Sequence, residues 1–180
     1  ICMRLFIAID LPKDVKTILY KVQKSIGNNL AKIHWVAPKN LHLTIKFIGE
    51  VEDSKVNEIK DRLNHIEYEK FNLNLDTIGF FPNNNFIRII WIGVNPEEKV
   101  TELQKKIDSS LLDLFSKDQR FDAHMTIGRV KNIKNREEFI KKINDTKIEN
   151  IKFEVNEFKL MKSTLSKDGP TYEEINSFKL

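Results

Sequence analysis

The sequence predicts an α+β fold built from two similar halves. A four-residue phrase, His-apolar-Thr-Ile, occurs at 42–45 and again at 124–127, an offset of 124 − 42 = 82 residues. A second phrase, Phe-x-apolar-Asn, occurs at 71–74 and at 153–156 with the same offset, 153 − 71 = 82. Two copies of an ordered set of segments indicate one duplication and not a solenoid, which needs more repeats.

The first half alternates strands and helices. An apolar strand at about 3–10 leads to a helix that opens near Pro12, because proline suits the first helical turn. The first His strand follows at about 41–48. A helix is predicted over about 53–68, where apolar residues recur at helical spacing, and the half closes with an alternating strand that starts at Phe71.

The second half repeats this order with a small difference in one connection. Arg4 and Arg88 begin similar apolar segments that each lead to a proline, and their offset is 88 − 4 = 84. A last strand is predicted near 172–179. The other predicted elements are a strand at 86–94, a helix at 97–115, the second His strand at 123–130, a helix at 135–144, and a strand that contains Phe153 and Val155.

Length and composition indicate one domain over 1–180, or two closely packed lobes. We expect Met3 to be the initiator and Ile1 and Cys2 to be left over from cloning, which leaves no thiolate metal site. No apolar run is long enough for a membrane span and no signal peptide is recognisable, so we expect a cytoplasmic protein. We also expect a monomer. The net charge of +4 and the pI of about 9.0 suit a polyanionic partner such as nucleic acid, but a lysine-rich surface alone gives the same values.

Each His strand is predicted to bury one face and to open the other, because side chains two residues apart point to the same side. In the first strand the open face takes His42, Thr44 and Lys46. The apolar residues between and after them, Phe47 included, take the core face.

In the second His strand the same alternation places His124, Thr126 and Gly128 on the open face. Gly128 would there let a ligand approach the backbone. Arg129 does not fit this alternation, so it reaches the open face only if the strand bends or ends there.

Two imidazoles and two hydroxyls around one space suit acid–base chemistry on a phosphate. Imidazole titrates near neutrality, so a neutral histidine can take a proton from an attacking hydroxyl or water while a protonated one supplies the leaving oxygen. Thr44, Thr126 and Arg129 would donate hydrogen bonds to the phosphate oxygens. This mechanism needs no metal and no other cofactor. The sequence contains neither a His-Glu-x-x-His zinc motif nor a Walker-type phosphate loop.

The chain resembles the 2H phosphoesterase superfamily, in particular its 2′-5′ RNA ligase-like, RNA 2′,3′-cyclic phosphodiesterase branch. The paired His-x-Thr-Ile phrases in their surroundings carry the resemblance, which extends over nearly the whole chain. One departure is Ala123, because the family often has proline before the second histidine. The segments concerned are 4–12, 35–49, 79–82, 88–93, 121–129, 163–165, 169–170 and 172–173.

This resemblance implies a bilobal fold with pseudo-twofold symmetry, in which two antiparallel sheets line a central groove and helices lie outside. It implies hydrolysis of RNA 2′,3′-cyclic phosphate ends to 2′-phosphomonoesters and, in some members, reversible ATP-independent 2′-5′ joining of tRNA-like ends. His42 and His124 are implied to be catalytic, with His124 as the base for water and His42 as the acid for O3′. Thr44, Thr126 and Arg129 are implied to bind the phosphate.

Further candidates for substrate contacts are Lys46, Phe81 and Tyr172. The segment around Phe81 is interpreted first as a hairpin turn and second as an aromatic rim on which a base stacks. Two other functions stay open, a non-catalytic binder of RNA ends and a phosphodiesterase for small nucleotides such as ADP-ribose cyclic phosphate. Two titrating histidines favour an enzyme, because a binder needs hydrogen-bond donors but no acid–base pair.

Overall fold

The computed structural model describes residues 1–180 as an α+β fold with antiparallel strands throughout. The α-helices are α1 (Lys13–Ile26), α2 (Val56–Asn64), α3 (Glu97–Ser110) and α4 (Arg136–Asp145). The strands are β1 (Cys2–Asp10), β2 (Ala31–Trp35), β3 (His42–Glu52), β4 (Phe71–Asn83), β5 (Phe86–Asn95), β6 (His124–Ile133), β7 (Lys152–Val155), β8 (Glu157–Ser166) and β9 (Gly169–Lys179). Two 3-10 turns, η1 (Pro38–Asn40) and η2 (Asp53–Lys55), precede β3 and α2.

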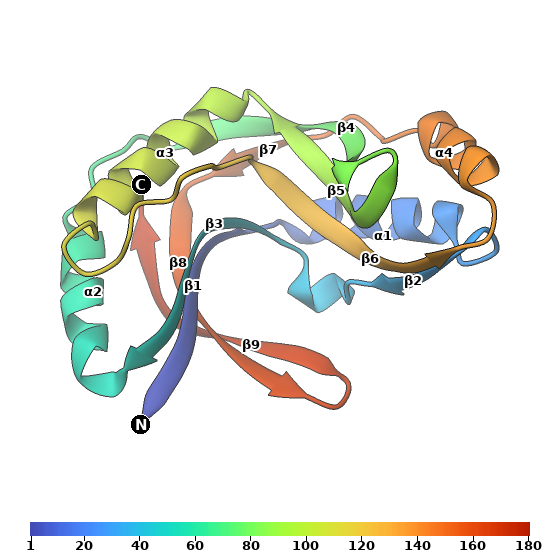
Figure 1. Ribbon diagram of the computed structural model, residues 1–180. Coiled ribbons are helices and arrows are strands. Elements are labelled where there is room, and N and C mark those ends of the chain that lie inside the picture. The colour runs from blue at the N-terminus through green and yellow to red at the C-terminus, as the bar shows by residue number, and fades with distance from the viewer.

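The strands form two sheets, and each His strand lies in a different one (Figure 1). Sheet A has the strand order β3-β1-β8-β9, and sheet B has the order β2-β6-β5-β4-β7. β3 carries His42 and β6 carries His124, and these two strands lie side by side where the sheets meet. Sheet A joins both halves of the sequence, because β8 pairs with β1. This confirms the predicted α+β class with two antiparallel sheets.

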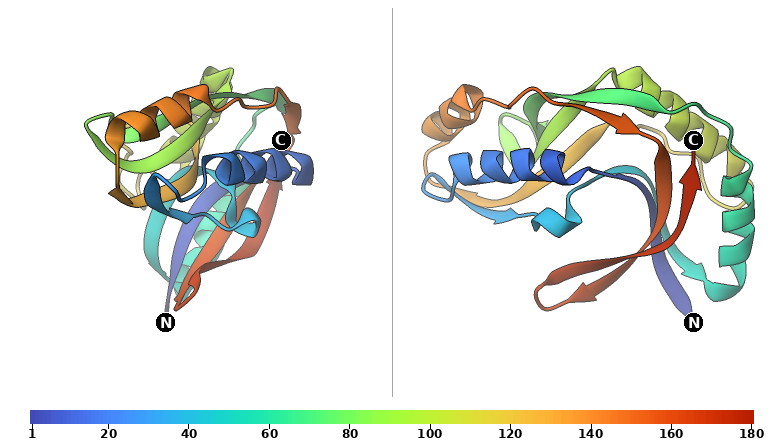
Figure 2. Two further views of the ribbon diagram at one scale, coloured as in Figure 1. Left: turned by 90° about the vertical axis from the view of Figure 1, so that its right-hand side faces the viewer. Right: turned by 180° about the vertical axis from the view of Figure 1, so that it is seen from behind.

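Helices α1 and α3 each pack against the His strand of the other half. α1 lies against β6, and α3 lies against β3 and β5. The rear view in Figure 2 shows α1 in front of β6. Apolar residues recur along α1 at helical spacing and are buried, as Val15, Leu19 and Val22 illustrate. A cluster of 40 buried apolar residues runs through both halves, so the two halves share one core. None of the helices combines the length and the apolar character that crossing a membrane demands.

The ladder between β4 and β7 shows the duplication directly. Phe71 pairs with Val155, and Leu73 pairs with Phe153. The residue 82 positions after Phe71 is Phe153, and the residue 82 positions before Val155 is Leu73. The duplication therefore converts the first pair into the second, which means that β4 and β7 are related by a local twofold axis. The repeated Phe-x-apolar-Asn phrases therefore mark the seam between the halves, and the predicted duplication is confirmed.

One predicted offset is wrong by a residue. In β1, Asp10 pairs with His42, and in β5, Gly93 pairs with His124. The structural offset of these strands is 93 − 10 = 83 and not 84. The two arginine-led segments look alike in sequence, but the ladders with the His strands fix their register.

Two strands and one turn also differ from the prediction. The strands β2 and β8 are not predicted from the sequence. β2 alternates apolar and basic residues but has only five residues, and in β8 the alternation lasts only over its first four residues. Phe81 lies within β4, paired with Ile89, and not in the predicted hairpin turn. The turn comes later, where Asn83 Oδ1 accepts hydrogen bonds from the backbone N–H groups of Asn85 and Phe86 at 2.9 and 3.0 Å.

Candidate active site

The two histidines of the repeated phrase are held in the same way. His42 Nδ1 lies 2.6 Å from the backbone oxygen of Asn40, and His124 Nδ1 lies 2.6 Å from that of Asp122. A carbonyl oxygen only accepts hydrogen bonds, so each Nδ1 carries a proton and donates it. In a neutral ring this leaves Nε2 unprotonated, and Nε2 is therefore the ring atom that can accept a proton in both copies.

His42 lies among aromatic side chains of sheet A. Its ring meets the rings of Phe6 and Tyr172 with centroid distances of 5.2 and 5.3 Å. Thr44 Oγ1 lies 2.8 Å from His42 Nε2 and donates its hydroxyl proton to the neutral ring. Burial disfavours the charged imidazolium and lowers the pKa of His42 from its ordinary value of 6.5, although the Asn40 carbonyl and the Asp10 carboxylate act in the opposite direction.

His124 rests against an aromatic pair of sheet B. The Phe81 ring meets the imidazole edge-on at 4.9 Å, and the Trp91 ring lies 6.2 Å away. Phe81 and Trp91 also contact each other, with centroids 5.1 Å apart. Gly79 leaves the space in which the Trp91 ring lies, because a Cβ at this position would be 2.6 Å from Trp91 Cη2. The aromatic pair thus confines the orientation of the His124 ring.

A β-bulge follows each His-x-Thr phrase at the same position. In β3, Lys46 pairs with Ile7 and Thr44 pairs with Ala8, so Ile45 is an extra residue. In β6 the pairs of Gly128 and Thr126 with successive residues of β5 leave Ile127 extra in the same way. A bulge places two consecutive residues on one side of the strand and reverses the alternation beyond it.

These bulges determine which of the following residues point to the same side of the strand as the histidines. We call the side of β3 and β6 that carries His42, Thr44, His124 and Thr126 the histidine face. Beyond the bulges, Arg129 is exposed on this face and Phe47, its equivalent at 129 − 82 = 47, is 75% exposed. The strand irregularity that Arg129 requires is therefore present, whereas the prediction that Phe47 packs in the core is wrong.

The prediction that Lys46 shares the open face is also wrong. Lys46 is 3% exposed, and its ammonium group bonds Asp108 of α3 at 2.6 Å, Asp118 at 2.9 Å and the Ser116 carbonyl at 3.1 Å. Burial lowers the pKa of Lys46, but the hydrogen bonds to the two carboxylates outweigh burial and raise it. Lys46 is thus a permanently charged link between β3 and α3, on the side away from the histidines.

Gly128 faces away from the histidines as well, contrary to the prediction. A Cβ on Gly128 would lie 2.8 Å from Cε3 of Trp35 and 2.9 Å from Cγ2 of Ile33, so the glycine admits these core side chains and not a ligand. In the first copy Lys46 links the His strand to a helix, and in the second copy Gln23 of α1 makes the corresponding link. Gln23 is 3% exposed, and its Nε2 donates to the carbonyls of Val36 and Ile127 at 2.9 Å each. Sequence reasoning missed this glutamine, whose only signal is its place in an amphipathic helix.

Tyr172 of sheet A and Arg129 of sheet B lie near each other at the site. The Tyr172 ring on β9 contacts His42, and burial raises the pKa of its hydroxyl while the nearby positive charge of Arg129 on β6 lowers it. Asn40 Nδ2 donates to the carbonyl of Pro170 at 3.0 Å, which holds β9 beside η1. No three His, Cys, Asp or Glu side chains gather as metal ligands would. The predicted residues that meet on the histidine face are His42, Thr44, His124, Thr126, Arg129, Phe81 and Tyr172.

Comparison with known proteins identifies the family. The model of the LigT-like phosphoesterases matches the chain twice, over residues 9–91 and over residues 92–172. The chain belongs to the LigT-like phosphoesterase family. This confirms the resemblance to the 2H phosphoesterases, and the two matches correspond to the two halves of the duplication.

Relatives of this LigT-like phosphoesterase match it over their full length. The RNA 2′,3′-cyclic phosphodiesterase of Methanocaldococcus jannaschii is 39% identical over 178 residues, 98% of this chain and 100% of that protein. The protein of the same name from Archaeoglobus fulgidus is 34% identical over 179 residues, 98% of this chain and 99% of that protein.

Solved structures show the same fold. Escherichia coli LigT complexed with 3′-AMP has a TM-score of 0.80 at 24% identity, over 100% of this chain and 99% of that one. The protein TT0787 of Thermus thermophilus has a TM-score of 0.78 at 24% identity, over 99% of this chain and 98% of the other. The LigT-like phosphoesterase described here therefore has the architecture of its distant relatives.

Proposed function

We propose that this LigT-like phosphoesterase hydrolyses 2′,3′-cyclic phosphate ends of RNA to 2′-phosphomonoesters. The observation that carries the proposal is the shared backbone setting of His42 and His124. Each imidazole is fixed by a backbone carbonyl at Nδ1 and has a threonine two residues further on the same face. The names of the full-length relatives, RNA 2′,3′-cyclic phosphodiesterase, support the same substrate class.

The chemistry needs one proton acceptor and one proton donor. Nε2 of one histidine takes a proton from water as the water oxygen bonds to phosphorus. Nε2 of the other histidine gives a proton to O3′ as the P–O3′ bond breaks, and a 2′-phosphomonoester with a free 3′-hydroxyl remains. Thr44, Thr126 and Arg129 would stabilise the charge on the non-bridging oxygens. Our assignment of His124 as the base and His42 as the acid stays a prediction.

The test is incubation with nucleoside 2′,3′-cyclic phosphates in the presence of EDTA, followed by identification of the product isomer. We expect turnover to the 2′-phosphomonoester, because two imidazoles supply the acid and the base. Activity that disappears in EDTA and returns with a divalent ion would contradict this mechanism. Binding without turnover would instead favour the non-catalytic binder, and preference for ADP-ribose cyclic phosphate would favour the small-nucleotide enzyme.

The same residues suit a 2′-5′ ligase reaction, which stays a prediction. A 5′-hydroxyl of RNA takes the place of water, so the attack forms a 2′-5′ phosphodiester and again releases O3′. Nothing in the chemistry calls for ATP, since the energy lies in the strained cyclic phosphate. Joining of an RNA with a 5′-hydroxyl to a cyclic end, without a nucleoside triphosphate, would demonstrate this activity.

A further inference from the structure

Beyond Arg129, the histidine face of sheet B continues as a row of basic side chains. His34 of β2 pairs directly with Arg129 of β6, and directly paired residues of antiparallel strands point to the same side. Lys32 and Lys131 continue the two strands on this side, since the residues between, Ile33 and Val130, are buried. All four basic side chains are exposed. We call Lys32, His34, Arg129 and Lys131 the basic strip.

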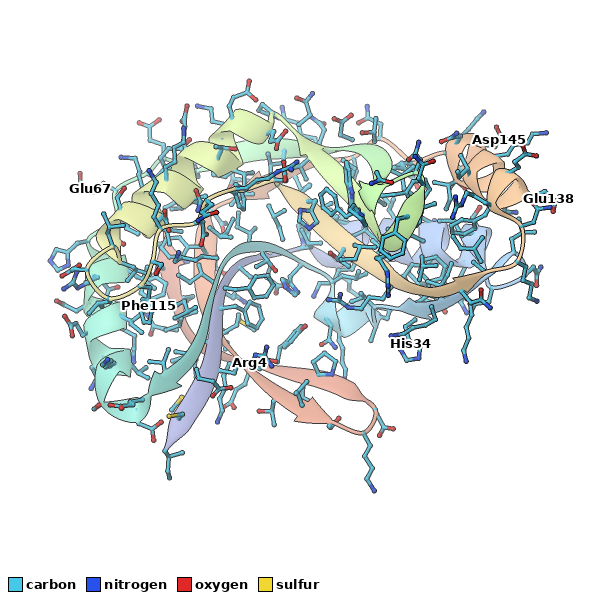
Figure 3. The ribbon with its side chains drawn as sticks, viewed as in Figure 1. Arg4, His34, Glu67, Phe115, Glu138 and Asp145 are labelled. Atoms are coloured by element: carbon cyan, nitrogen blue, oxygen red, sulfur yellow. The ribbon has the colours of Figure 1, made fainter.

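The side chain of His34 shows the direction of this strip. In Figure 3, His34 projects from β2 on the side away from α1, which covers the opposite face of the sheet. Ile33, its neighbour in sequence, points to the core side, where its Cγ2 atom lies close to Gly128. The strip therefore begins at Arg129, beside the histidines, and leads outward to the edge strand of sheet B.

No acidic residue interrupts the positive charge of these strands. β2, β6 and β5 are neighbours in sheet B, and together they contain no aspartate and no glutamate. The side chains of the strip are also free of ion pairs within the chain, since none of them takes part in a salt bridge. Three unpaired cations in a row along a sheet, Lys32, Arg129 and Lys131, with the polar His34 between them, are suited to a polyanionic strand and not to a single phosphate.

Sheet A differs in charge although its strands are related by the duplication. On the histidine face, β1 of sheet A carries the exposed cation Arg4. Arg4 pairs with Glu50 of β3 on one side and with Ser163 of β8 on the other, and Ser163 in turn pairs with Tyr172 of β9. Glu50 is exposed and acidic. The strands of sheet A also carry Asp10, Glu52 and other carboxylates, so this sheet offers a strand of phosphates no continuous positive surface.

We propose that the RNA leading to the cyclic end lies across sheet B, along the basic strip. A 2′,3′-cyclic phosphate occupies the 3′ end of a chain, so all remaining nucleotides lie on its 5′ side and need one exit from the site. Arg129 binds the cyclic phosphate, and Lys131, His34 and Lys32 contact successive upstream phosphates. This inference rests on the proposed function and gives it a preference for polynucleotides over mononucleotides.

The test compares two substrates that share one reaction, a nucleoside 2′,3′-cyclic phosphate and a short oligoribonucleotide with the same cyclic end. We expect the double variant Lys32→Gln/Lys131→Gln to have an about ten-fold lower kcat/KM on the oligonucleotide. Each lost phosphate contact should lower kcat/KM by about two- to five-fold. Its activity on the mononucleotide should not change, which also shows that the variant is folded. The slope of log kcat/KM against log salt should become shallower by about 1.4, about 0.7 for each lost contact with single-stranded RNA.

Arg4→Gln is the matched control, because Arg4 is an exposed cation on the same side of sheet A (Figure 3). It should leave both substrates unaffected. A loss specific to the oligonucleotide in Arg4→Gln, or equal effects of the double variant on both substrates, would overturn the proposal. If the wild-type protein hydrolyses neither substrate, the proposed function fails. Anisotropy of the labelled oligonucleotide then tests the strip by itself, and equal affinities of the wild type and the double variant would overturn it.

Discussion

Ile45 and Ile127, which are 82 residues apart, are the extra residues of two equivalent β-bulges. Each bulge follows a His-x-Thr phrase and turns the strand so that the residue two positions beyond joins the histidines. That residue is Phe47 in one copy and Arg129 in the other. The duplication thus preserves the geometry of the phrase while the side chains beyond it have diverged, one to an aromatic surface and one to a cation.

Replacing either histidine should remove most of the activity. We expect His42→Ala and His124→Ala each to lower kcat by at least about 10²-fold, which is a typical contribution of a general acid or base. Both side chains are only partly buried, so the variants should unfold at denaturant concentrations close to that of the wild type. Turnover close to that of the wild type in either variant would show that the histidine is structural.

The pH dependence of kcat/KM tests the role of His42. Burial lowers the pKa of His42 below its ordinary value of 6.5, so the limb that this residue sets lies below pH 6.5. If His42 is the acid, only its protonated form is active, and kcat/KM falls as the pH rises through this limb. If kcat/KM instead falls as the pH drops through it, His42 is the base. The limbs belong to the coupled pair of histidines, so the assignment also requires the profile of His42→Ala.

Removing the buried lysine should destabilise the fold. Lys46→Met leaves the carboxylates of Asp108 and Asp118 without their counter-ion, one of them with a side chain only 5% exposed. We expect a loss of about 3–5 kcal/mol in the free energy of unfolding, measured with urea. The control is Lys16→Met, which breaks the more exposed pair with Asp10 and should cost less than about 1 kcal/mol. Equal losses in the two variants would contradict the structural role of Lys46.

The space beside Trp91 offers a test of how His124 is oriented. Gly79→Ala places a Cβ 2.6 Å from Cη2 and 2.7 Å from Cε2 of Trp91, so the indole must move and shift its neighbour His124. We expect a lower kcat and a loss of about 1–3 kcal/mol in stability from overpacking. Gly93→Ala is the matched control, because its Cβ would lie 3.4 Å from the same ring, an ordinary contact. If both variants keep full activity, the aromatic pair does not control the histidine.

Gln23 should act on Arg129 from the opposite side of sheet B. Gln23→Met keeps the volume but loses both hydrogen bonds to the carbonyls of Val36 and Ile127, so the bulge that orients Arg129 is no longer held. We expect kcat/KM to fall by about five-fold, which corresponds to a coupling of about 1 kcal/mol.

A double-mutant cycle separates this coupling from a general loss of stability. In the Arg129→Met background the effect of Gln23→Met on kcat/KM should largely disappear, because the side chain that the bulge orients is already gone. Fully additive effects would show that Gln23 contributes only to folding. Unfolding in urea, measured on all four proteins, confirms that the compared variants are folded.

The parts of the fold that can be predicted are those that one segment determines by itself. Pro12 marks the start of α1, the helical spacing of apolar residues locates α2 and α3, and the repeated phrases locate β3, β6 and the seam between β4 and β7. The His-x-Thr pairs can be identified because alternation over three residues is independent of the partner strand.

The rest cannot be predicted because it depends on pairing between strands. A bulge is defined by the register of two strands, so neither Ile45 nor Ile127 differs in sequence from an ordinary strand residue. Simple alternation therefore assigns Lys46, Phe47 and Gly128 to the wrong side of their strands. The asparagines that follow Phe81 resemble a turn, while its ladder with β5 extends the strand to Asn83.

The pairing of β1 with β8 also has a consequence for how the protein is made. A ribosome synthesises β1 and β3 early, but the neighbours that complete sheet A, β8 and β9, emerge only after every other element. Tyr172, which meets His42, comes with them. Until β8 and β9 have left the exit tunnel, β1 has an unpaired edge and His42 lacks its contact with Tyr172. Catalytic competence should therefore arise in one step, once β8 and β9 have emerged, and not grow as the chain lengthens.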